Sequence, residues 1–156
     1  MKLSKNLSLG EFTRSQTAKR RGLDNTPQGN HLEAAKELAE NIFQPIREHF
    51  GKPIFISSGY RSQALNEAIG GSKTSQHSKG EAIDIDMDHR GGPENEEVFH
   101  YIRENLDFDQ LIWEFGTDER PDWVHVSYKK GGPQRGQILK AKRNSAGKTY
   151  YENWKA

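Results

Sequence analysis

Histidine and aspartate side chains that could bind a metal ion lie close together in one segment of the sequence. His77 stands in a loop that contains Gly80, and Asp84 and Asp86 lie in the apolar run that follows. Because side chains alternate between the two faces of a strand, the aspartates would share one face and the isoleucines beside them the other. The segment therefore predicts an imidazole and carboxylates at the entry to one strand.

A second histidine lies in a strand-like segment further along the chain. In Trp123-Val124-His125-Val126-Ser127 the valines face one way and His125 the other. Two imidazoles and one carboxylate suit zinc, and three protein ligands leave a position open, which is typical of a catalytic site. Calcium requires more oxygen ligands. The sequence therefore predicts one zinc ion bound by His77, Asp84 and His125.

Each of these three residues also has a structural explanation when it is considered alone. His77 would be a surface loop residue, Asp84 a turn cap and His125 a core histidine with satisfied hydrogen bonds. Their combination favours a shared site, because Gly80 and Ala82 allow the backbone to pack closely between the first two.

The segments around the candidate ligands predict one small α+β domain. Apolar, β-branched runs favour strands, and apolar residues at helical spacing favour helices. We expect a small, mainly antiparallel sheet that carries the zinc site, with helices packed on one face. The expected strands are Ile54–Ser57, Ala82–Met87, Gln110–Phe115 and Trp123–Tyr128, and the two shorter helices are Ser62–Ile69 and Glu94–Asn105.

A longer amphipathic helix precedes the first expected strand. Thr26-Pro27 predicts its start, with a capping hydroxyl and proline at the first helical position. Pro45 should kink or break this helix near Phe43. The whole chain, 1–156, is expected to form a single domain with a core at about 27–130. The basic tail, about 131–156, predicts either a loose appendage or an edge hairpin.

Composition excludes several classes of protein. The formal net charge is only +1, so the chain has no overall field that would attract nucleic acid or a membrane surface. No cysteine is present, which excludes disulfides, thiolate zinc sites and cysteine nucleophiles. No segment approaches the roughly 20 apolar residues of a membrane span. We expect no membrane insertion and no specific nucleic-acid partner, for which the basic tail would be the only support.

The sequence resembles the zinc D-alanyl-D-alanine carboxypeptidases of peptidase family M15, and most closely their short phage and prophage subgroup. The family signature is Ser-x-His, then Asp seven residues after the histidine, then a Trp-x-His strand. This resemblance implies the α+β fold of hedgehog domains and D,D-peptidases, with zinc on the sheet. The matching positions are Ser75, His77, Asp84, Trp123 and His125, and the similarity extends to Leu7-Ser8-Leu9-Gly10-Glu11-Phe12, Asp24-Asn25-Thr26-Pro27, Ser58-Gly59-Tyr60-Arg61-Ser62 and Gly70-Gly71-Ser72.

The resemblance implies a peptidase that cuts the stem peptide or cross-bridge of bacterial peptidoglycan, as a carboxypeptidase or an endopeptidase, in phage lysis or entry. Zinc would activate a water that attacks the peptide carbonyl. The alternative is a non-catalytic wall-binding or virion module on the same fold. Met1–Asn6 lack the apolar run of a secretion signal. We therefore expect a protein made in the cytoplasm that acts at the cell wall after release or within a virion. Separately, we expect a monomer.

Two acidic residues are candidates for the catalytic base. In the family an acid three residues before the last ligand relays protons, and Asp122 matches that pattern. Strict strand alternation would point Asp122 away from His125, so the match requires irregular backbone, which Pro121 favours. Glu114 is the rival, because a charge between bulky apolar neighbours on a strand needs a reason.

Further candidates follow from the same motifs. Arg61 matches a family arginine that binds the substrate carbonyl or the developing oxyanion, so it is a candidate for both substrate binding and catalysis. A plain salt bridge is its structural alternative. Ser75 and Trp123 are expected to bind substrate, although Ser75 would also suit a loop cap. Asp86 could orient a ligand imidazole.

Overall fold

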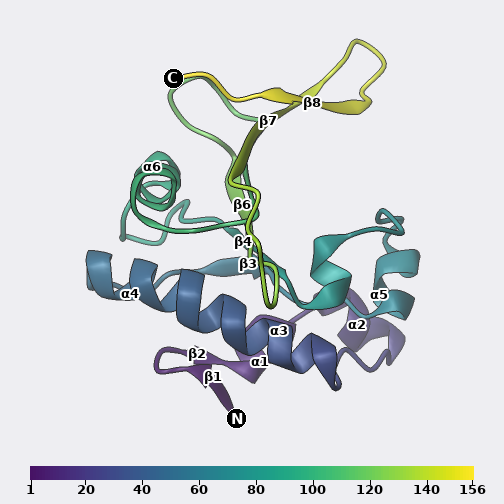
Figure 1. The fold of residues 1–156 in the computed structure, drawn as a ribbon. Helices are drawn as coiled ribbons and strands as arrows, with labels where there is room; N and C mark the ends of the chain where they lie inside the picture. Colours follow the sequence, from purple (N-terminus) through teal and green to yellow (C-terminus); the bar gives the residue numbers. More distant parts are fainter.

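The computed structural model describes residues 1–156 and has an α+β fold. A six-stranded sheet forms its centre, and a two-stranded sheet of β1 (Lys2–Ser4) and β2 (Leu7–Ser8) lies at the N-terminus (Figure 1). No helix is long and apolar enough to cross a membrane. The strands cross the large sheet in the order β3 (Ile56–Ser58), β4 (Ala82–Ile85), β6 (Trp123–Ser127), β5 (Gln110–Glu114), β7 (Gln137–Arg143) and β8 (Thr149–Asn153).

Strand pairing in the large sheet is antiparallel except at one position. β3 pairs with β4, β4 with β6, β6 with β5 and β7 with β8, all antiparallel, whereas β5 and β7 are parallel. A parallel pair requires a longer connection than a hairpin, and the chain makes it by passing through β6 and a loop before β7. The predicted α+β fold with a mainly antiparallel sheet is confirmed.

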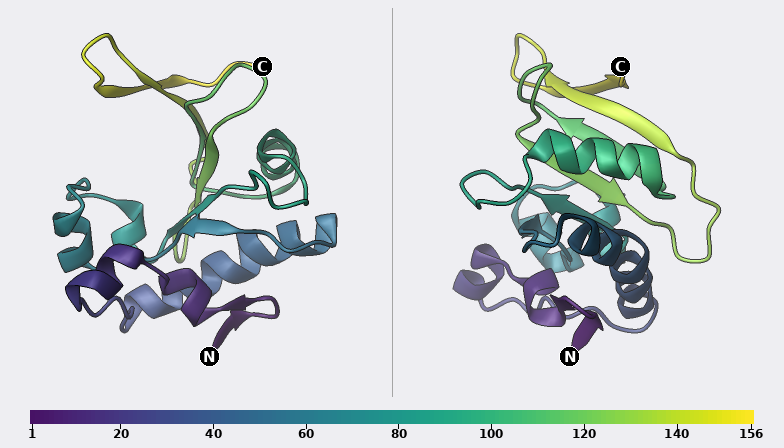
Figure 2. Two further views of the ribbon diagram at one scale, coloured as in Figure 1. Left: turned by 180° about the vertical axis from the view of Figure 1, so that it is seen from behind. Right: turned by 90° about the vertical axis from the view of Figure 1, so that its left-hand side faces the viewer.

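Helices lie on both sides of the sheet, with α4 and α6 on one side and α2 and α5 toward the other (Figure 1). In Figure 1, where the sheet is seen nearly edge-on, α6 lies on one side with α3 and α4 beneath it, and the right-hand view of Figure 2 shows α6 in front of the strands. The helical segments are α1 (Leu9–Thr13), α2 (Gln16–Arg21), α3 (Asn30–Leu38), the π-helical turn η1 (Ala39–Phe43), α4 (Gln44–Phe50), α5 (Gln63–Ala68), the 3₁₀ turn η2 (Gln76–Lys79) and α6 (Asn95–Asn105).

The long helix begins later than predicted. Thr26-Pro27 lie in irregular backbone, where the N–H of Thr26 donates to Asp24 Oδ1 at 3.0 Å, and α3 starts at Asn30 behind Gly29. The prediction that Thr26 caps the helix was wrong, because the backbone stays irregular as far as Gly29, whose φ of +51° lies outside the helical region. The predicted interruption before Pro45 is confirmed, and it takes the form of the π turn η1. Proline has no N–H for the helical ladder, and a π turn accommodates that loss.

The predicted core boundaries of about 27 and 130 are too narrow. Leu3, Leu7 and Phe12 are buried in the main apolar cluster, because the small N-terminal sheet and α1 pack against the central helices. At the other end the tail forms the β7–β8 hairpin at the edge of the sheet, and Ala141 is fully buried. Of the two alternatives for the tail, the edge hairpin is the one observed.

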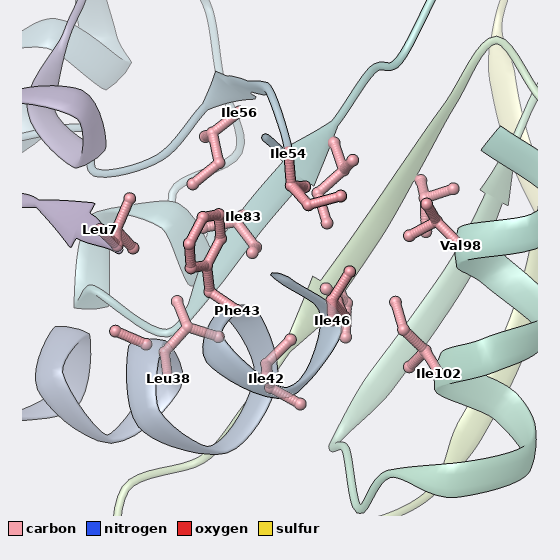
Figure 3. Packing of buried hydrophobic residues seen from close by; sticks show 14 of the residues in the cluster. Leu7, Leu38, Ile42, Phe43, Ile46, Ile54, Ile56, Ile83, Val98 and Ile102 are labelled. Atoms are coloured by element: carbon pink, nitrogen blue, oxygen red, sulfur yellow. The ribbon is translucent and has the colours of Figure 1, made fainter. Parts of the chain in front are cut away.

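The apolar core fills the space between one face of the sheet and the helices. Ile83 of β4 lies beside Phe43 of η1, and Val98 and Ile102 of α6 lie further along the same cluster, with Ile46 of α4 between the two groups (Figure 3). Alternation along the strands explains this arrangement, since every second residue faces the helices. The residues between them, which include Asp84 and His125, face the opposite side.

Candidate metal centre

Asp84 and His125 lie directly opposite each other on neighbouring strands. β4 and β6 pair in a register that joins these two residues, with Ile83 opposite Val126 and Ile85 opposite Val124. His125 Nδ1 is 2.9 Å from Asp84 Oδ1. Because the flanking apolar residues are fully buried on the other face, both polar side chains are held on the open face of the sheet.

His77 reaches this pair from the 3₁₀ turn η2. Ser75 caps the turn by accepting the N–H of His77 at 3.2 Å, and Gly80 ends it with a φ of +75°. A Cβ at Gly80 would lie 2.3 Å from the carbonyl oxygen of His31, so only glycine lets η2 pack this closely on α3. His77 Nε2 is then 3.3 Å from Asp84 Oδ1.

The structure therefore brings together the three predicted metal ligands. One ligand atom from each of His77, Asp84 and His125 lies within 4.8 Å of the others. The two histidines are 3% and 8% exposed, so the donor atoms are shielded from bulk water. Two imidazoles and a carboxylate form a donor set that suits zinc and leaves a coordination position open.

Hydrogen bonds around His77 assign its ring nitrogens. His77 Nδ1 is 2.7 Å from the carbonyl oxygen of Gly59, which can only accept, so Nδ1 donates and Nε2 is the nitrogen that faces Asp84. Arg61 holds the same turn by donating its backbone N–H to the His77 carbonyl at 3.2 Å. A histidine ligand whose other nitrogen donates to a carbonyl is the usual arrangement at metal sites.

Asp84 is ionised in this environment. Burial by itself would raise the pKa of Asp84, but the charges of His77 and His125 and the hydrogen bonds to them outweigh it. The pKa of Asp84 therefore lies well below its usual range. The site holds a carboxylate between two imidazoles, which is the charge pattern expected of a cation site.

Glu114 lies on the same face as the three ligands. In the β5–β6 register Ile112 is opposite His125 and Glu114 is opposite Trp123, so alternation puts Glu114 on the face of His125. Its side chain is buried at 7% exposure. Burial raises the pKa of Glu114 to about 7, the charge of Asp84 adds to this rise, and His125 and Arg143 oppose it. A carboxyl group with this pKa can accept and release protons at neutral pH.

Asp122, the other candidate for the catalytic base, lies in a more exposed position than Glu114. It precedes β6, its side chain is exposed, and its backbone N–H donates to the Glu114 carbonyl at 2.9 Å. The Asp122 carbonyl accepts a hydrogen bond from Asn95 Nδ2 at 3.0 Å. Asp122 lines a groove of about 600 Å³ together with Arg143 and Tyr150. The metal cluster does not line that groove.

The remaining predicted residues surround the cluster or support it. Arg61 is half-buried, its Nε has no hydrogen-bond partner, and burial lowers its pKa while the charge of Asp84 raises it. Ser75 directs its hydroxyl to the N–H of His77, as a loop cap. Trp123 stacks edge-on against Phe115 with ring centroids 5.4 Å apart.

The prediction that Asp86 orients a ligand imidazole is wrong. Strand β4 ends at Ile85, and Asp86 Oδ1 accepts hydrogen bonds from the Asp88 N–H at 3.1 Å and from Asn95 Nδ2 at 3.3 Å. The carboxylate therefore closes the turn after the strand. Ile85 and Met87 on either side are buried in the core, but the hydrogen bonds of the Asp86 carboxylate go to the turn and to α6 and not to an imidazole.

Sequence reasoning missed two features beside the site. Gln76 places Oε1 2.8 Å from His125 Nε2, on the side of the ring away from Asp84. Phe115 leaves β5 with a φ of +56°, which breaks the alternation and brings its ring to Trp123. The position of Gln76 next to a ligand histidine was the only sequence signal for the first feature, and Gly116 after the strand hinted at the second.

A buried His-Asp-His cluster on an α+β sheet, with a carboxyl group of raised pKa on the same face, defines a metallohydrolase-like centre. A family model described as Peptidase M15 matches residues 5–127. The chain therefore belongs to peptidase family M15, whose members are zinc peptidases, and the family predicted from the motifs is confirmed. A comparison with curated proteins finds no match. The match covers all three predicted ligands and ends at the last residue of β6, before the β7–β8 hairpin.

Proposed function

We propose that this protein is a zinc-dependent peptidase that hydrolyses peptide bonds in bacterial peptidoglycan. The observation that carries the proposal is the convergence of His77, Asp84 and His125 within 4.8 Å on the open face of the sheet. Membership of a peptidase family supports hydrolysis as the reaction. The stem peptide or cross-bridge is the proposed substrate, on the resemblance to D-alanyl-D-alanine carboxypeptidases.

The chemistry of the donor set fits zinc. His77 would bind through Nε2, the nitrogen left free by its hydrogen bond to Gly59, and Asp84 would bind through its ionised carboxylate. His125 supplies the second imidazole. When bound, zinc supplies a Lewis acid for the peptide carbonyl and lowers the pKa of a water nucleophile.

Glu114 is the proposed general base. It shares the face of the ligands, it is buried, and its pKa of about 7 allows it to take a proton from water and pass it to the leaving amine. Asp122, the other sequence candidate, is exposed and lines the groove at the strand ends. This geometry favours Glu114, and Asp122→Asn serves as the matched comparison.

Arg61 is proposed to bind the substrate oxygen. A buried guanidinium nitrogen without a partner is costly, and a substrate carbonyl or oxyanion would satisfy it. The Arg61 backbone is fixed by its hydrogen bond to His77, so the side chain starts from a defined position beside the cluster. Trp123 stays a candidate for substrate contact, because its ring lies on the Glu114 face of the sheet.

The proposed setting is phage or prophage lysis or entry, with the protein reaching the wall after release from the cell or as part of a virion. This proposal rests on the family resemblance. Release of wall fragments from intact cells by externally added protein, and not by a protein lacking zinc, would support it.

The test is digestion of purified peptidoglycan by the wild type, His77→Ala and Glu114→Gln, with zinc measured in each protein and the fragments identified by mass spectrometry. We expect zinc-dependent new peptide termini from the wild type alone, no zinc in His77→Ala, and zinc without cleavage in Glu114→Gln. Bound zinc without cleavage of several wall types would instead indicate a non-catalytic binding module.

A further inference from the structure

A chain of hydrogen bonds runs from His125 away from the metal cluster to the loop after β6. His125 Nε2 is 2.8 Å from Gln76 Oε1, and Gln76 Nε2 is 3.5 Å from Asp109 Oδ2. Arg135 closes the chain on Asp109, with Nη2 2.8 Å from Oδ2 and Nε 3.1 Å from Oδ1. Each member reaches the next from a different part of the chain.

Asp109 is the fixed point of this chain. It is 5% exposed, its backbone N–H donates to the Ser127 carbonyl at 2.9 Å, and its carbonyl accepts the Gln137 N–H at 3.1 Å. Its carboxylate also accepts the backbone N–H of Arg135 at 3.0 Å. The hydrogen bonds from Arg135 hold the pKa of Asp109 below its usual range, so the group is an acceptor only.

The chemistry of the partners dictates the direction of every bond. Because Asp109 only accepts, Gln76 must present its amide nitrogen to that carboxylate and its oxygen to His125. The oxygen of Gln76 only accepts, so His125 Nε2 must carry the hydrogen. Nδ1 is then the nitrogen left for Asp84, 2.9 Å away, and the one that can exchange its hydrogen for a metal.

We propose that Gln76, Asp109 and Arg135 are positioning residues that hold the hydrogen of His125 on Nε2 and so reserve Nδ1 for the metal. This inference rests on the proposed zinc site, and it extends the site to Arg135, which lies beyond the residues matched by the family model. Loss of such outer hydrogen bonds at other metal sites weakens metal binding by about 10- to 100-fold.

Asp109→Asn tests the direction of the chain, because it changes one atom far from the metal. The oxygen of the new amide stays with the backbone N–H and Nε of Arg135, which can only donate. Its nitrogen then faces Gln76, and the Nη2 donor of Arg135 loses its acceptor and must turn to solvent. The Gln76 amide must turn its oxygen toward this nitrogen and present N–H groups to His125. His125 is forced to accept at Nε2, and its hydrogen moves to Nδ1, the atom that faces Asp84.

Two readouts follow this reversal. Zinc affinity, measured by chelator competition, should fall by about 10- to 100-fold in Asp109→Asn. Nitrogen-15 NMR of the histidine side chains should show a protected Nε2–H on His125 in the wild type and its loss in the variant. The NMR measurement can also be made on zinc-free protein. A wild type that binds no zinc would therefore count against the proposed function, and the NMR signal would still test the hydrogen-bond chain.

The double variant Asp109→Asn/Gln76→Glu provides the rescue. A carboxylate at position 76 accepts from the new amide on one side and from His125 Nε2–H on the other, so the original direction returns. Zinc affinity and the Nε2–H signal should recover to near the wild-type values. Asp107→Asn, an exposed aspartate two residues away, is the control and should change neither.

The proposal is overturned if Asp109→Asn keeps both the zinc affinity and the Nε2–H signal of the wild type. It is also overturned if the double variant does not recover zinc affinity and the Nε2–H signal while Asp109→Asn remains folded by circular dichroism. Asp109 would then serve only to hold the loop that contains Arg135. Should Asp109→Asn not fold, Gln76→Leu replaces it. Gln76 is partly exposed, and its loss should lower zinc affinity and weaken the protection of Nε2–H.

Discussion

One face of the paired strands β4 and β6 packs into the apolar core, and the other face carries the candidate metal site. On one face Ile83, Ile85, Val124 and Val126 are fully buried against the helices. On the other face Asp84 and His125 lie opposite each other in the same register. Neighbouring residues along one strand therefore contribute either to stability or to chemistry. Because alternation separates the two sets, substitutions one residue apart should have different consequences.

The comparison is sharpest at the adjacent residues Asp84 and Ile85. Asp84→Ala removes the carboxylate that faces both imidazoles, so zinc affinity should fall by more than the about 100-fold typical of outer hydrogen bonds. Peptidase activity should be lost with the metal. Titration calorimetry with zinc measures the first effect, and unfolding of the zinc-free protein should show a smaller loss of stability than that of Ile85→Ala. A large loss of stability would mean that the two faces are not independent.

Glu114→Gln should act on the reaction without acting on the metal. Loss of a general base slows catalysis by about 10²- to 10⁴-fold, and the neutral amide keeps the shape of the side chain. We expect kcat/KM to fall by this factor while zinc content stays that of the wild type. Asp122→Asn, an exposed position, should lower the rate far less. If Asp122→Asn lowered kcat/KM more than Glu114→Gln, the catalytic base would be Asp122.

Ile85→Ala should act on stability without acting on zinc binding. The side chain is fully buried in the main apolar cluster, and truncation of a buried isoleucine costs about 2–5 kcal/mol. Urea unfolding measures the loss, and the folded variant should keep the zinc affinity of the wild type. Ile85→Val is the graded control, at about 0.5–1.5 kcal/mol. Weaker zinc binding in either variant would show that the core adjusts the position of Asp84.

The pKa of Glu114 predicts a pH effect on stability in the zinc-free protein. The folded-state pKa is about 7 against an ordinary value of 4.5, so between these values the folded protein binds more protons than the unfolded chain. The free energy of unfolding should therefore fall as pH rises from about 4.5 through 7. Asp84 acts in the opposite direction and at lower pH, because its pKa is depressed.

Glu114→Gln tests this assignment, since the amide does not titrate. Urea unfolding across the same pH range should lose the decline in the variant. An unchanged decline would assign it to another group.

Local sequence patterns predicted many of the helices and strands. The strand with Asp84 and the strand with His125 were both predicted within a few residues of their observed bounds, because alternation depends only on neighbouring residues. The interruption before Pro45 was predicted for the same reason. The start of the long helix was not, since irregular backbone continues to Gly29, whose positive φ delays the helix to Asn30. The contribution of Leu3 and Leu7 to the core depends on packing between distant segments.

The sequence by itself indicated the three candidate ligands and determined their family, since their types and spacing form a recognisable motif. Only the tertiary structure decided that Glu114 lies on the ligand face while Asp122 lines another groove, because strand register and backbone irregularity depend on pairing. The tertiary structure also decided that Gln76 bonds both Asp109 and His125, on the side of the His125 ring away from Asp84. Hydrogen bonds between residues far apart in the chain have no local signature, so folding alone brings them together.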